Sequence, residues 1–330
     1  ELDWMLKMQD AASGGVYHKV TALVFPETVL AVDETDDMVL APFSYAATAD
    51  FAAVMAKASV LYAEYDADFA KSCLDAATNA YAFLEANPDM KGYENPEDLV
   101  TGAYDDTHLA DETLWASAEM YIATKDAKYL TATKTALDSN YLTGFGWADI
   151  GSYALYDLAK TEGVDADVAK TAKEKLLADA DETLSKAESE GFFTGMGVTY
   201  PWGSNMTITN KGMELLAAAN LTGDAKYTEY AQKMRDYIFG VNPTGYCYVT
   251  GYGSLTPNAT HHRPSQVLKE TMPGMLVGGA NNNLNDPYAN AVLYGIALGR
   301  AYVDNEQCYS CNEVTIYWNS PLIYLLTGLN

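Results

Sequence analysis

The sequence predicts an all-α protein whose building unit is a hairpin of two helices. Apolar residues recur every three or four positions in three stretches, 51–65, 69–83 and 227–238, as they do along one face of an amphipathic helix. No run of residues alternates between apolar and polar as a half-buried strand does. The joints between the predicted helices also repeat one short pattern, which indicates that the chain is built by repeating helical pairs.

Each joint contains an Asp that is placed to cap the next helix, followed three residues later by the aromatic residue that begins its buried face. The three copies are "YDADF" (65–69), "KDAKY" (125–129) and "GDAKY" (223–227), with capping residues Asp66, Asp126 and Asp224. Their spacing is irregular, which argues against a solenoid of equal repeats. Hairpins joined by long, variable loops suit a closed ring of helices with the loops around one mouth.

The helix ends follow from the local sequence. The second helix is expected to stop at "NPD" (87–89), and the helix over 227–238 at Gly240 and Pro243. We expect ten or eleven helices in all. No linker rich in Pro or Ser divides the chain, so residues 1–330 are interpreted as one domain.

Charge and composition exclude several classes of function. The net charge of −25 and the pI near 4.3 disfavour nucleic-acid binding, because no stripe of Lys or Arg offsets the negative field. The apolar runs are far shorter than the roughly 20 residues of a membrane span, so a soluble protein is expected. The 25 Tyr and 5 Trp residues suit sugar faces as well as cores.

The first residues, "ELDWMLKMQ", resemble the inside of a helix, and no signal peptide is visible. The chain is therefore expected to be a fragment or a processed product that lacks an upstream segment. Four cysteines are too few for a disulfide scaffold. Cys73 lies on an apolar helical stripe and is predicted to be buried. Cys308 and Cys311 form a CxxC pair without nearby His ligands, so zinc is not favoured and a local disulfide stays open.

Acidic residues crowd into "YDDTHLADE" (104–112), just before a periodic helix. Two interpretations are possible. Asp111 or Glu112 suits a helix N-terminus, where negative charge is stabilising. Paired carboxylates together with loop carbonyls are also the hard oxygen ligands that calcium prefers, although their spacing is not that of an EF-hand.

Three further loops combine polar residues with aromatic rings or glycine. "THHRP" (260–264) holds two histidines and Arg263, and its simplest interpretation is a hydrogen-bonded loop anchor. "GFGWAD" (144–149) and "VTYPWGSN" (198–205) each place a Trp in a glycine-containing loop, which favours packing or the binding of a flat ligand.

The stretch "DNEQCYSCNEVTIYWNSP" (304–321) carries two separated carboxylates, Asp304 and Glu313, before a run of aromatic residues. These acids are either solvated surface groups or a pair that acts on a glycosidic bond. For Glu313 to hold a proton near neutral pH its pKa must be raised, and neighbouring aromatic rings and a second carboxylate can raise it.

Together these segments resemble glycoside hydrolase family 9, the cellulase family. Its C-terminal motif requires aromatic residues, an Asp, a Glu, an Asn and small residues at fixed spacings. Every position is met, by Tyr302, Asp304, Tyr309, Glu313, Thr315, Asn319 and Ser320. The family's His-x-Arg motif is matched by His261 and Arg263. That loop departs from the family's preferences at Thr260, Leu255 and Cys247.

The resemblance covers essentially the whole chain and implies an (α/α)6 toroid that hydrolyses β-1,4-glucan with inversion. It is most similar to the branch whose catalytic domain follows an immunoglobulin-like module. The resemblance implies Glu313 as the general acid, with Asp304 and His261 beside it. The implied substrate-binding residues are Arg263, Trp318, Trp147 and Trp202. A structural Ca²⁺ is implied at Asp111, Glu112, Asp149 and the carbonyls of Thr107 and His108.

The family's paired aspartates, in an Asp-Ala-Gly-Asp segment, do not occur in this sequence. An inverting enzyme needs a base roughly 6.5–9.5 Å from the acid. The chain is therefore expected to hold the C-terminal major part of the catalytic domain, without the base and one or two helices short of twelve. A secreted, extracellular, monomeric protein is expected, with immunoglobulin-like, dockerin or carbohydrate-binding modules in the full-length chain.

Three alternatives remain open. The same fold serves exo-acting cellobiohydrolases and cellodextrinases. A catalytically incomplete chain could only bind carbohydrate. Another helical toroid enzyme, such as a polysaccharide lyase, would use different chemistry and give an unsaturated product.

Overall fold

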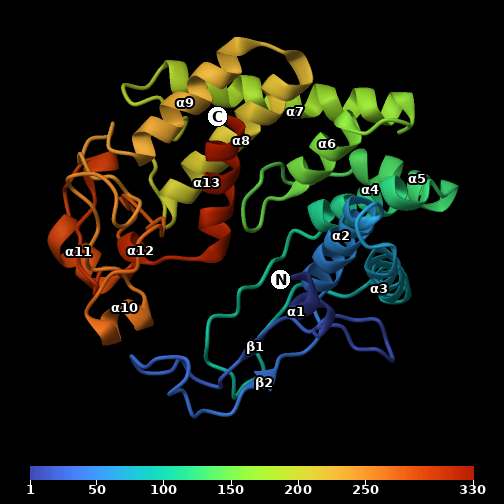
Figure 1. The fold of residues 1–330 in the computed structure, drawn as a ribbon, viewed down its shortest axis with the longest axis horizontal. Coiled ribbons are helices and arrows are strands. Elements are labelled where there is room, and N and C mark those ends of the chain that lie inside the picture. The colour runs from blue at the N-terminus through green and yellow to red at the C-terminus, as the bar shows by residue number, and fades with distance from the viewer. The chain divides into compact units, whose positions relative to one another are not determined.

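The computed structural model describes residues 1–330, and it is mostly helical (Figure 1). The only strands have two residues each, Val20–Thr21 (β1) and Val39–Leu40 (β2), and they pair antiparallel. The helices in chain order are α1 (Leu2–Leu6), α2 (Tyr45–Tyr62), α3 (Ala67–Ala86), α4 (Ala110–Thr124), α5 (Ala127–Leu137), α6 (Gly151–Lys160), α7 (Ala166–Glu188), α8 (Ser204–Thr222), α9 (Ala225–Ile238), α10 (Arg263–Leu268), α11 (Pro287–Leu293), the 3₁₀ helix η1 (Leu298–Arg300), α12 (Tyr309–Asn312) and α13 (Ile316–Gly328).

The structure has thirteen α-helices, more than the ten or eleven that the sequence predicts. Four of the thirteen, α1, α10, α11 and α12, are only four to seven residues long. A helix of one or two turns is too short to show a periodic apolar face, because the 3.6-residue period is repeated at most twice. Such short helices are the ones that sequence periodicity misses.

The predicted Asp caps are confirmed. Each carboxylate accepts a hydrogen bond from a backbone N–H in the first turn of its helix: Asp66 at 2.9 Å in α3, Asp126 at 2.8 Å in α5 and Asp224 at 2.9 Å in α9. An N-cap of this kind satisfies one of the free N–H groups at the helix start. The repeated joint therefore marks the second helix of three hairpins.

The contacts of the chain gather into two compact units. Unit 1 comprises Glu1–Pro26, Thr35–Gly144 and Ala148–Lys175. Unit 2 comprises Glu27–Glu34, Phe145–Trp147 and Leu176–Asn330. The interpretation of residues 1–330 as one domain stays a prediction.

In unit 1, α2 packs against both α3 and α4, and α4 packs against α5 and α6 (Figure 1). Small residues let α2 approach its neighbours closely, since Ala52, Ala53 and Ala56 are fully buried. On α3, by contrast, the buried residues form one stripe that includes Ala70, Cys73, Ala77, Ala80 and Leu84. A helix buried on several sides lies inside a helical layer, and a helix with one stripe covers it.

A buried ion network joins three helices of unit 1. Asp157 of α6 is 4% exposed and pairs with Lys57 of α2 and, at 2.8 Å, with Lys160. Glu119 of α4 lies 3.9 Å from the same Lys57 amine and accepts a 3.1 Å hydrogen bond from the Trp115 indole. Buried charges require such partners, because an unpaired charge would be strongly destabilising.

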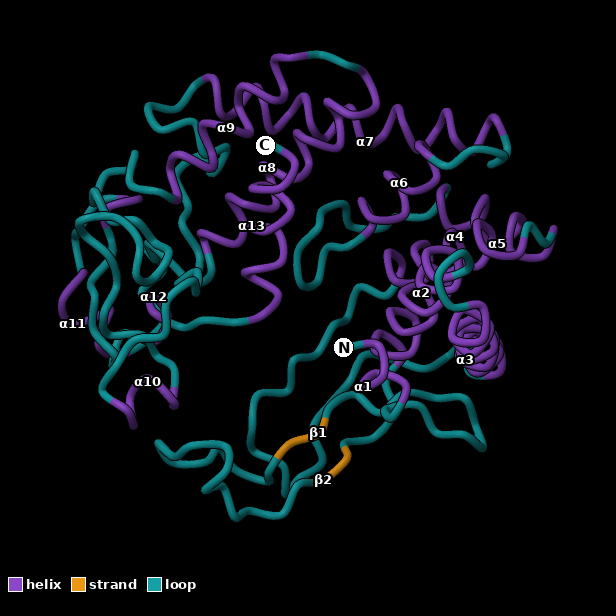
Figure 2. Tube along the Cα trace, viewed as in Figure 1, coloured by secondary structure: helices purple, strands orange, loops and turns teal.

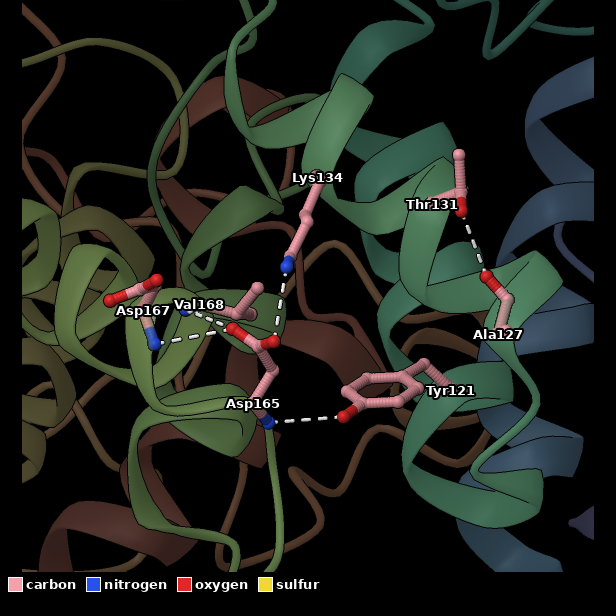
Figure 3. Close-up of polar contacts among 7 residues, drawn as sticks. All are labelled: Tyr121, Ala127, Thr131, Lys134, Asp165, Asp167 and Val168. Atoms are coloured by element: carbon pink, nitrogen blue, oxygen red, sulfur yellow. Dashed lines mark hydrogen bonds and ion pairs between the residues drawn. The ribbon is translucent and has the colours of Figure 1, made fainter.

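Asp165 ties the start of α7 to two other helices of the unit (Figure 3). Its carboxylate accepts from the N–H groups of Asp167 and Val168, both at 3.2 Å, and pairs with Lys134 of α5 at 3.0 Å. Its own N–H donates to the hydroxyl of Tyr121 of α4 at 3.0 Å. The ion pair with Lys134 lowers the pKa of Asp165.

In unit 2, α8 packs against α9 and α13 (Figure 1). The centre of this packing is apolar and closed to water, and it includes Ile208, Leu215, Tyr237, Tyr248 and Leu325. The remainder of the unit is largely loop, in which α10, α11 and α12 are short insertions (Figure 2). These loops carry most of the predicted acid-site residues.

Asp286 fixes part of this loop region. It is 3% exposed, caps α11 through the N–H of Ala289 at 2.7 Å, and also accepts from the N–H of Ser310 at 3.1 Å. The thiol of Cys308 lies 3.6 Å from the same carboxylate. One buried acid thus holds α11 and α12 together.

All four cysteines are free and buried. The predicted burial of Cys73 is confirmed. The disulfide that the sequence leaves open between Cys308 and Cys311 is not formed in this structure. No helix has both the length and the apolar character needed to cross a membrane.

Candidate functional site

Glu313 and His261 lie side by side, although they are far apart in the sequence. They form an isolated parallel bridge, and the N–H of His261 donates to the carbonyl of Asn312 at 2.9 Å. The carbonyl of Glu313 accepts from the N–H of Gly278 at 3.1 Å. Glu313 is the C-cap of α12, and backbone pairing with two other loops also sets its position.

The carboxyl group of Glu313 is half-buried in unit 2. Its Oε2 accepts a 2.9 Å hydrogen bond from the indole Nε1 of Trp202. Burial raises the pKa of Glu313, while the Trp202 hydrogen bond and the charges of His261 and Arg263 lower it. The net pKa is above the ordinary value, as a group that must carry a proton requires.

Aromatic rings surround the acid. The ring of Tyr309 lies 5.4 Å from that of Trp202 and 5.7 Å from the imidazole of His261, measured between centroids. The Nδ1 of His261 lies 3.1 Å from the carbonyl of Glu306. A carbonyl oxygen only accepts, so Nδ1 carries the proton in this contact. The imidazole is thereby fixed in one orientation.

Asp304 fastens the loop that carries His261. Its two carboxylate oxygens accept from the N–H groups of Asn258 and Ala259, each at 2.9 Å. A carboxylate that accepts two backbone N–H groups makes charge-assisted bonds, which are stronger than neutral ones. The predicted companion of the acid is thus a positioning group for the segment before His261.

Asn312, the residue before the acid, has a role that the sequence analysis missed. It is fully buried, and its side-chain amide donates to the carbonyls of Val303 at 2.7 Å, Asn305 at 3.1 Å and Cys308 at 3.1 Å. Its side-chain oxygen accepts from the hydroxyl of Tyr302 at 2.8 Å. The only sequence signal was its position beside Glu313.

The three tryptophans that were predicted to contact sugar lie in different environments. Trp202 is 38% exposed and bonded to the acid, and Trp147 is 50% exposed. Trp318 is only 3% exposed and packs against Gly203 and Gly278. The prediction that Trp318 contacts sugar is therefore wrong for this structure, because its ring is covered by the chain. Trp318 lies on the buried side of the first turn of α13, whereas Ile316 and Tyr317 of the same turn are exposed.

Arg263 lies at the start of α10, two residues after His261. Its positive charge lowers the pKa of Glu313, so it acts on the acid electrostatically. The structure therefore brings Glu313, His261, Arg263 and Trp202 together, with Asp304 one loop away.

A second group of carboxylates lies in unit 1, at the start of α4. Asp111 is fully buried and Glu112 is 2% exposed. Asp111 Oδ1, Glu112 Oε2 and Asp50 Oδ1 are buried without a hydrogen-bond partner. Burial, Asp50 and Asp111 raise the pKa of Glu112 to about 9, and burial with Asp111 and Asp106 raises that of Asp50 to about 8. We call Asp50, Asp106, Asp111 and Glu112 the carboxylate cluster.

The residues predicted to bind calcium fit this cluster in part. Asp111 and Glu112 belong to it, and the N–H of Ile150, the residue after Asp149, donates to Asp111 at 3.0 Å. Thr107, His108 and Asp149 are exposed. Nowhere in the chain do three or more His, Cys, Asp or Glu side chains converge closely enough to hold a metal as they stand. The donor chemistry nevertheless suits a hard cation, since the partnerless atoms are carboxylate oxygens. Sequence reasoning missed Asp50, which lies in mid-helix.

The hydrogen bond from Trp202 depends on local backbone structure. Gly203 has a φ of +78°, and a side chain there would lie 3.1 Å from Trp318. Next to it, the N–H of Asn205 donates to the carbonyl of Gly278 at 3.0 Å, and Gly278 in turn bonds Glu313. The segments 200–205 ("YPWGSN") and 276–283 ("LVGGANNN") are thus side by side at the acid.

Comparisons with known proteins agree with this interpretation of the motifs. A cellodextrinase of Butyrivibrio fibrisolvens is 34% identical over 348 residues, covering 100% of this chain and 63% of the relative. A xyloglucan-specific endo-β-1,4-glucanase of Bacteroides ovatus is 36% identical, covering 100% of this chain and 59% of the relative. The chain thus spans about three fifths of the length of these relatives.

Among solved structures, a single mutant of a thermostable endoglucanase from Alicyclobacillus acidocaldarius superposes with a TM-score of 0.96. It is 40% identical, and the match covers 100% of this chain and 63% of that one. With the mostly helical secondary structure, this likeness confirms the predicted fold class, the all-α (α/α)6 toroid. The family model described as Glycosyl hydrolase family 9 matches residues 1–326, and the chain belongs to that family.

Proposed function

We propose that the protein to which this chain belongs is an endo-acting β-1,4-glucanase that hydrolyses cellulose and related β-glucans with inversion of configuration. Glu313 is the general acid that protonates the oxygen of the leaving sugar. The observation that carries the proposal is the half-buried carboxyl of Glu313, with its raised pKa, between Trp202, His261 and Arg263.

The roles of the other site residues follow from their contacts. His261, held by the carbonyl of Glu306, and Arg263 present hydrogen-bond donors beside the acid and bind sugar hydroxyl groups. Asp304 holds the loop that carries both of them. Trp147 and Trp202 have exposed ring area for stacking on sugar faces.

An inverting hydrolase also needs a carboxylate base on the opposite side of the bond. The family's paired aspartates, which the sequence lacks, are proposed to supply it from a segment that precedes residue 1 in the full-length protein. In this proposal the chain carries the acid part of the machinery. The full-length protein is also proposed to be secreted and monomeric, with an immunoglobulin-like module and other accessory modules.

The test compares this chain with a form extended upstream, on carboxymethylcellulose and on short cellodextrins. Glu313→Gln in the active form is expected to lower kcat roughly 10²–10⁴-fold, the usual contribution of a general acid. Glu270→Gln, a matched change at an exposed loop residue, serves as the control. The first product should be the α anomer by ¹H NMR. Full activity of the Glu313→Gln variant, or an unsaturated product, would exclude the proposal.

Cleavage at chain ends is the second candidate, and the cellodextrinase among the relatives favours it. An endo-acting enzyme lowers the viscosity of carboxymethylcellulose faster than it releases reducing ends. An exo-acting cellobiohydrolase or cellodextrinase releases short sugars with little loss of viscosity. If neither form of the protein hydrolyses either substrate but both bind cellodextrins, the chain is a carbohydrate-binding fragment.

We also propose that the carboxylate cluster holds a structural Ca²⁺, with Asp111 and Glu112 as ligands and with Asp149 and the carbonyls of Thr107 and His108 completing the site. The support is the set of buried carboxylate oxygens without partners. Isothermal titration of the EDTA-treated protein with CaCl₂ tests the site directly. Binding is expected for the wild type and is expected to be lost in Asp111→Asn. Equal binding by both would refute the site.

A further inference from the structure

Trp202 approaches the acid with its N–H rather than with its ring face. The indole Nε1 is 2.9 Å from Oε2 of Glu313. An indole N–H can only donate. The oxygen that it contacts therefore acts as an acceptor, and the two oxygens of this carboxyl group are not equivalent.

The backbone around Trp202 is fixed to the same segment that fixes Glu313. The N–H of Tyr200 donates to the side-chain oxygen of Asn282 at 2.7 Å, and Gly203 turns the chain in a left-handed conformation. Two residues later, Asn205 bonds Gly278, whose own N–H donates to the carbonyl of Glu313. The donor and the acceptor are therefore tied to one shared segment of backbone, which keeps the indole aimed at one oxygen.

We propose that Trp202 is a positioning residue for the general acid: its N–H holds Oε2 of Glu313 and leaves Oε1 to carry the proton that is transferred. The inference rests on the proposed function of Glu313. In the reaction, the proton passes from Oε1 to the oxygen of the leaving sugar and the carboxyl becomes a carboxylate. The bond from Trp202 is then charge-assisted, so it stabilises the acid after transfer. Reprotonation from water completes the cycle.

Other groups around Glu313 also affect its pKa and its surroundings. His261 and Arg263 lie on the paired loop, and the charge of each favours the carboxylate form. Tyr309 lies between Trp202 and His261 and contributes apolar surface. The carboxylate of Asp304 accepts hydrogen bonds from the backbone N–H groups of Asn258 and Ala259, in the loop that carries His261. Trp202 is thus the group that lowers the pKa of Glu313 through a hydrogen bond, whereas His261 and Arg263 act through their charge.

The test measures the titration of Glu313 itself, by ¹³C NMR of the carboxyl carbon, with Glu313→Gln used to assign the signal. Trp202→Phe keeps a ring and removes the N–H, so the midpoint of Glu313 should rise by about half to one pKa unit. The matched control is Trp4→Phe, a change at a half-exposed indole of α1, which should leave the midpoint unchanged. An unchanged or lowered midpoint in Trp202→Phe would overturn the inference.

If Trp202→Phe fails to fold, 3-benzothienylalanine at residue 202 replaces the N–H by sulfur with almost the same ring shape, and the same upward shift is expected. In the form with hydrolase activity, the basic limb of the kcat/KM profile should move to higher pH by the same amount. A shifted midpoint together with no activity in the upstream-extended form would refute the hydrolase proposal and support the hydrogen bond from Trp202. Activity with an unshifted midpoint would support the hydrolase proposal and refute the proposed role of Trp202.

Discussion

Two acid sites in this molecule, one half-buried and one buried, differ in the charges that surround the carboxyl group. Around Glu313 in unit 2, an indole N–H, an imidazole and a guanidinium oppose the effect of burial on its pKa. Around Glu112 in unit 1, the neighbours Asp50, Asp106 and Asp111 are themselves acids, so they add to that effect. The comparison teaches that burial alone does not define a catalytic acid. The sign of the neighbouring charges separates a carboxyl group whose pKa is held down by donors and cations from a cluster of acids that needs a cation or protons.

The largest expected effect is on the pH dependence of stability without calcium. The folded pKa of Glu112, about 9, lies above its ordinary value of 4.5, so the folded state binds more protons between these limits. Glu112 therefore does not reduce the free energy of unfolding below about pH 4.5, and it reduces this free energy increasingly as the pH rises towards 9. Glu112→Gln removes this loss and should stabilise the EDTA-treated protein at pH 8 by on the order of 3–6 kcal/mol.

Urea unfolding at pH 5 and pH 8, in EDTA, measures this difference. Glu313→Gln should give a smaller gain, because donors already stabilise that carboxylate. Added Ca²⁺ should restore the wild type at pH 8 and have less effect on Glu112→Gln. If the free energy of unfolding changed equally with pH in the wild type and in Glu112→Gln, the proposed difference between the two acid sites would be wrong.

The next effect concerns the scaffold of the acid site. Asn312→Ala removes the amide bonds to the carbonyls of Val303, Asn305 and Cys308 and leaves the buried hydroxyl of Tyr302 without its acceptor, so we expect a loss of about 2–4 kcal/mol in the free energy of unfolding. Asn330→Ala, at an exposed position, should cost little. Chemical unfolding of both variants provides the measurement. Equal stability of the two variants would mean that the hydrogen bonds of the Asn312 amide do not stabilise the site.

The smallest effect is expected for Asp304→Asn. An amide can accept one of the two N–H bonds from Asn258 and Ala259, but it presents a donor where the second oxygen was. A destabilisation of about 1–3 kcal/mol is expected from the loss of the charged acceptor. Asp89→Asn, a change at an exposed loop acid, should be neutral when both are compared by thermal unfolding. A neutral Asp304→Asn would show that the loop is held by other contacts.

Local patterns in the sequence predicted much of the fold and part of the site. Asp126 and Asp224 were recognisable as caps because a cap depends on the next three residues only. Glu313, His261 and Asp304 were recognisable from motif spacing. Asn312 and Asp50 were not, since the role of each depends on groups that come from distant parts of the chain. The burial of a ring such as Trp318 likewise depends on what packs against it, and the sequence does not state this.

The pairing of His261 with Glu313 has a consequence for how intactness of the site can be followed. The amide of His261 exchanges its hydrogen with solvent only when its bond to Asn312 opens, and that opening separates the imidazole from the acid. The protection factor of the His261 amide, measured by hydrogen–deuterium exchange, therefore reports how often the loop that carries His261 separates from the segment that carries Glu313. This measurement needs no substrate.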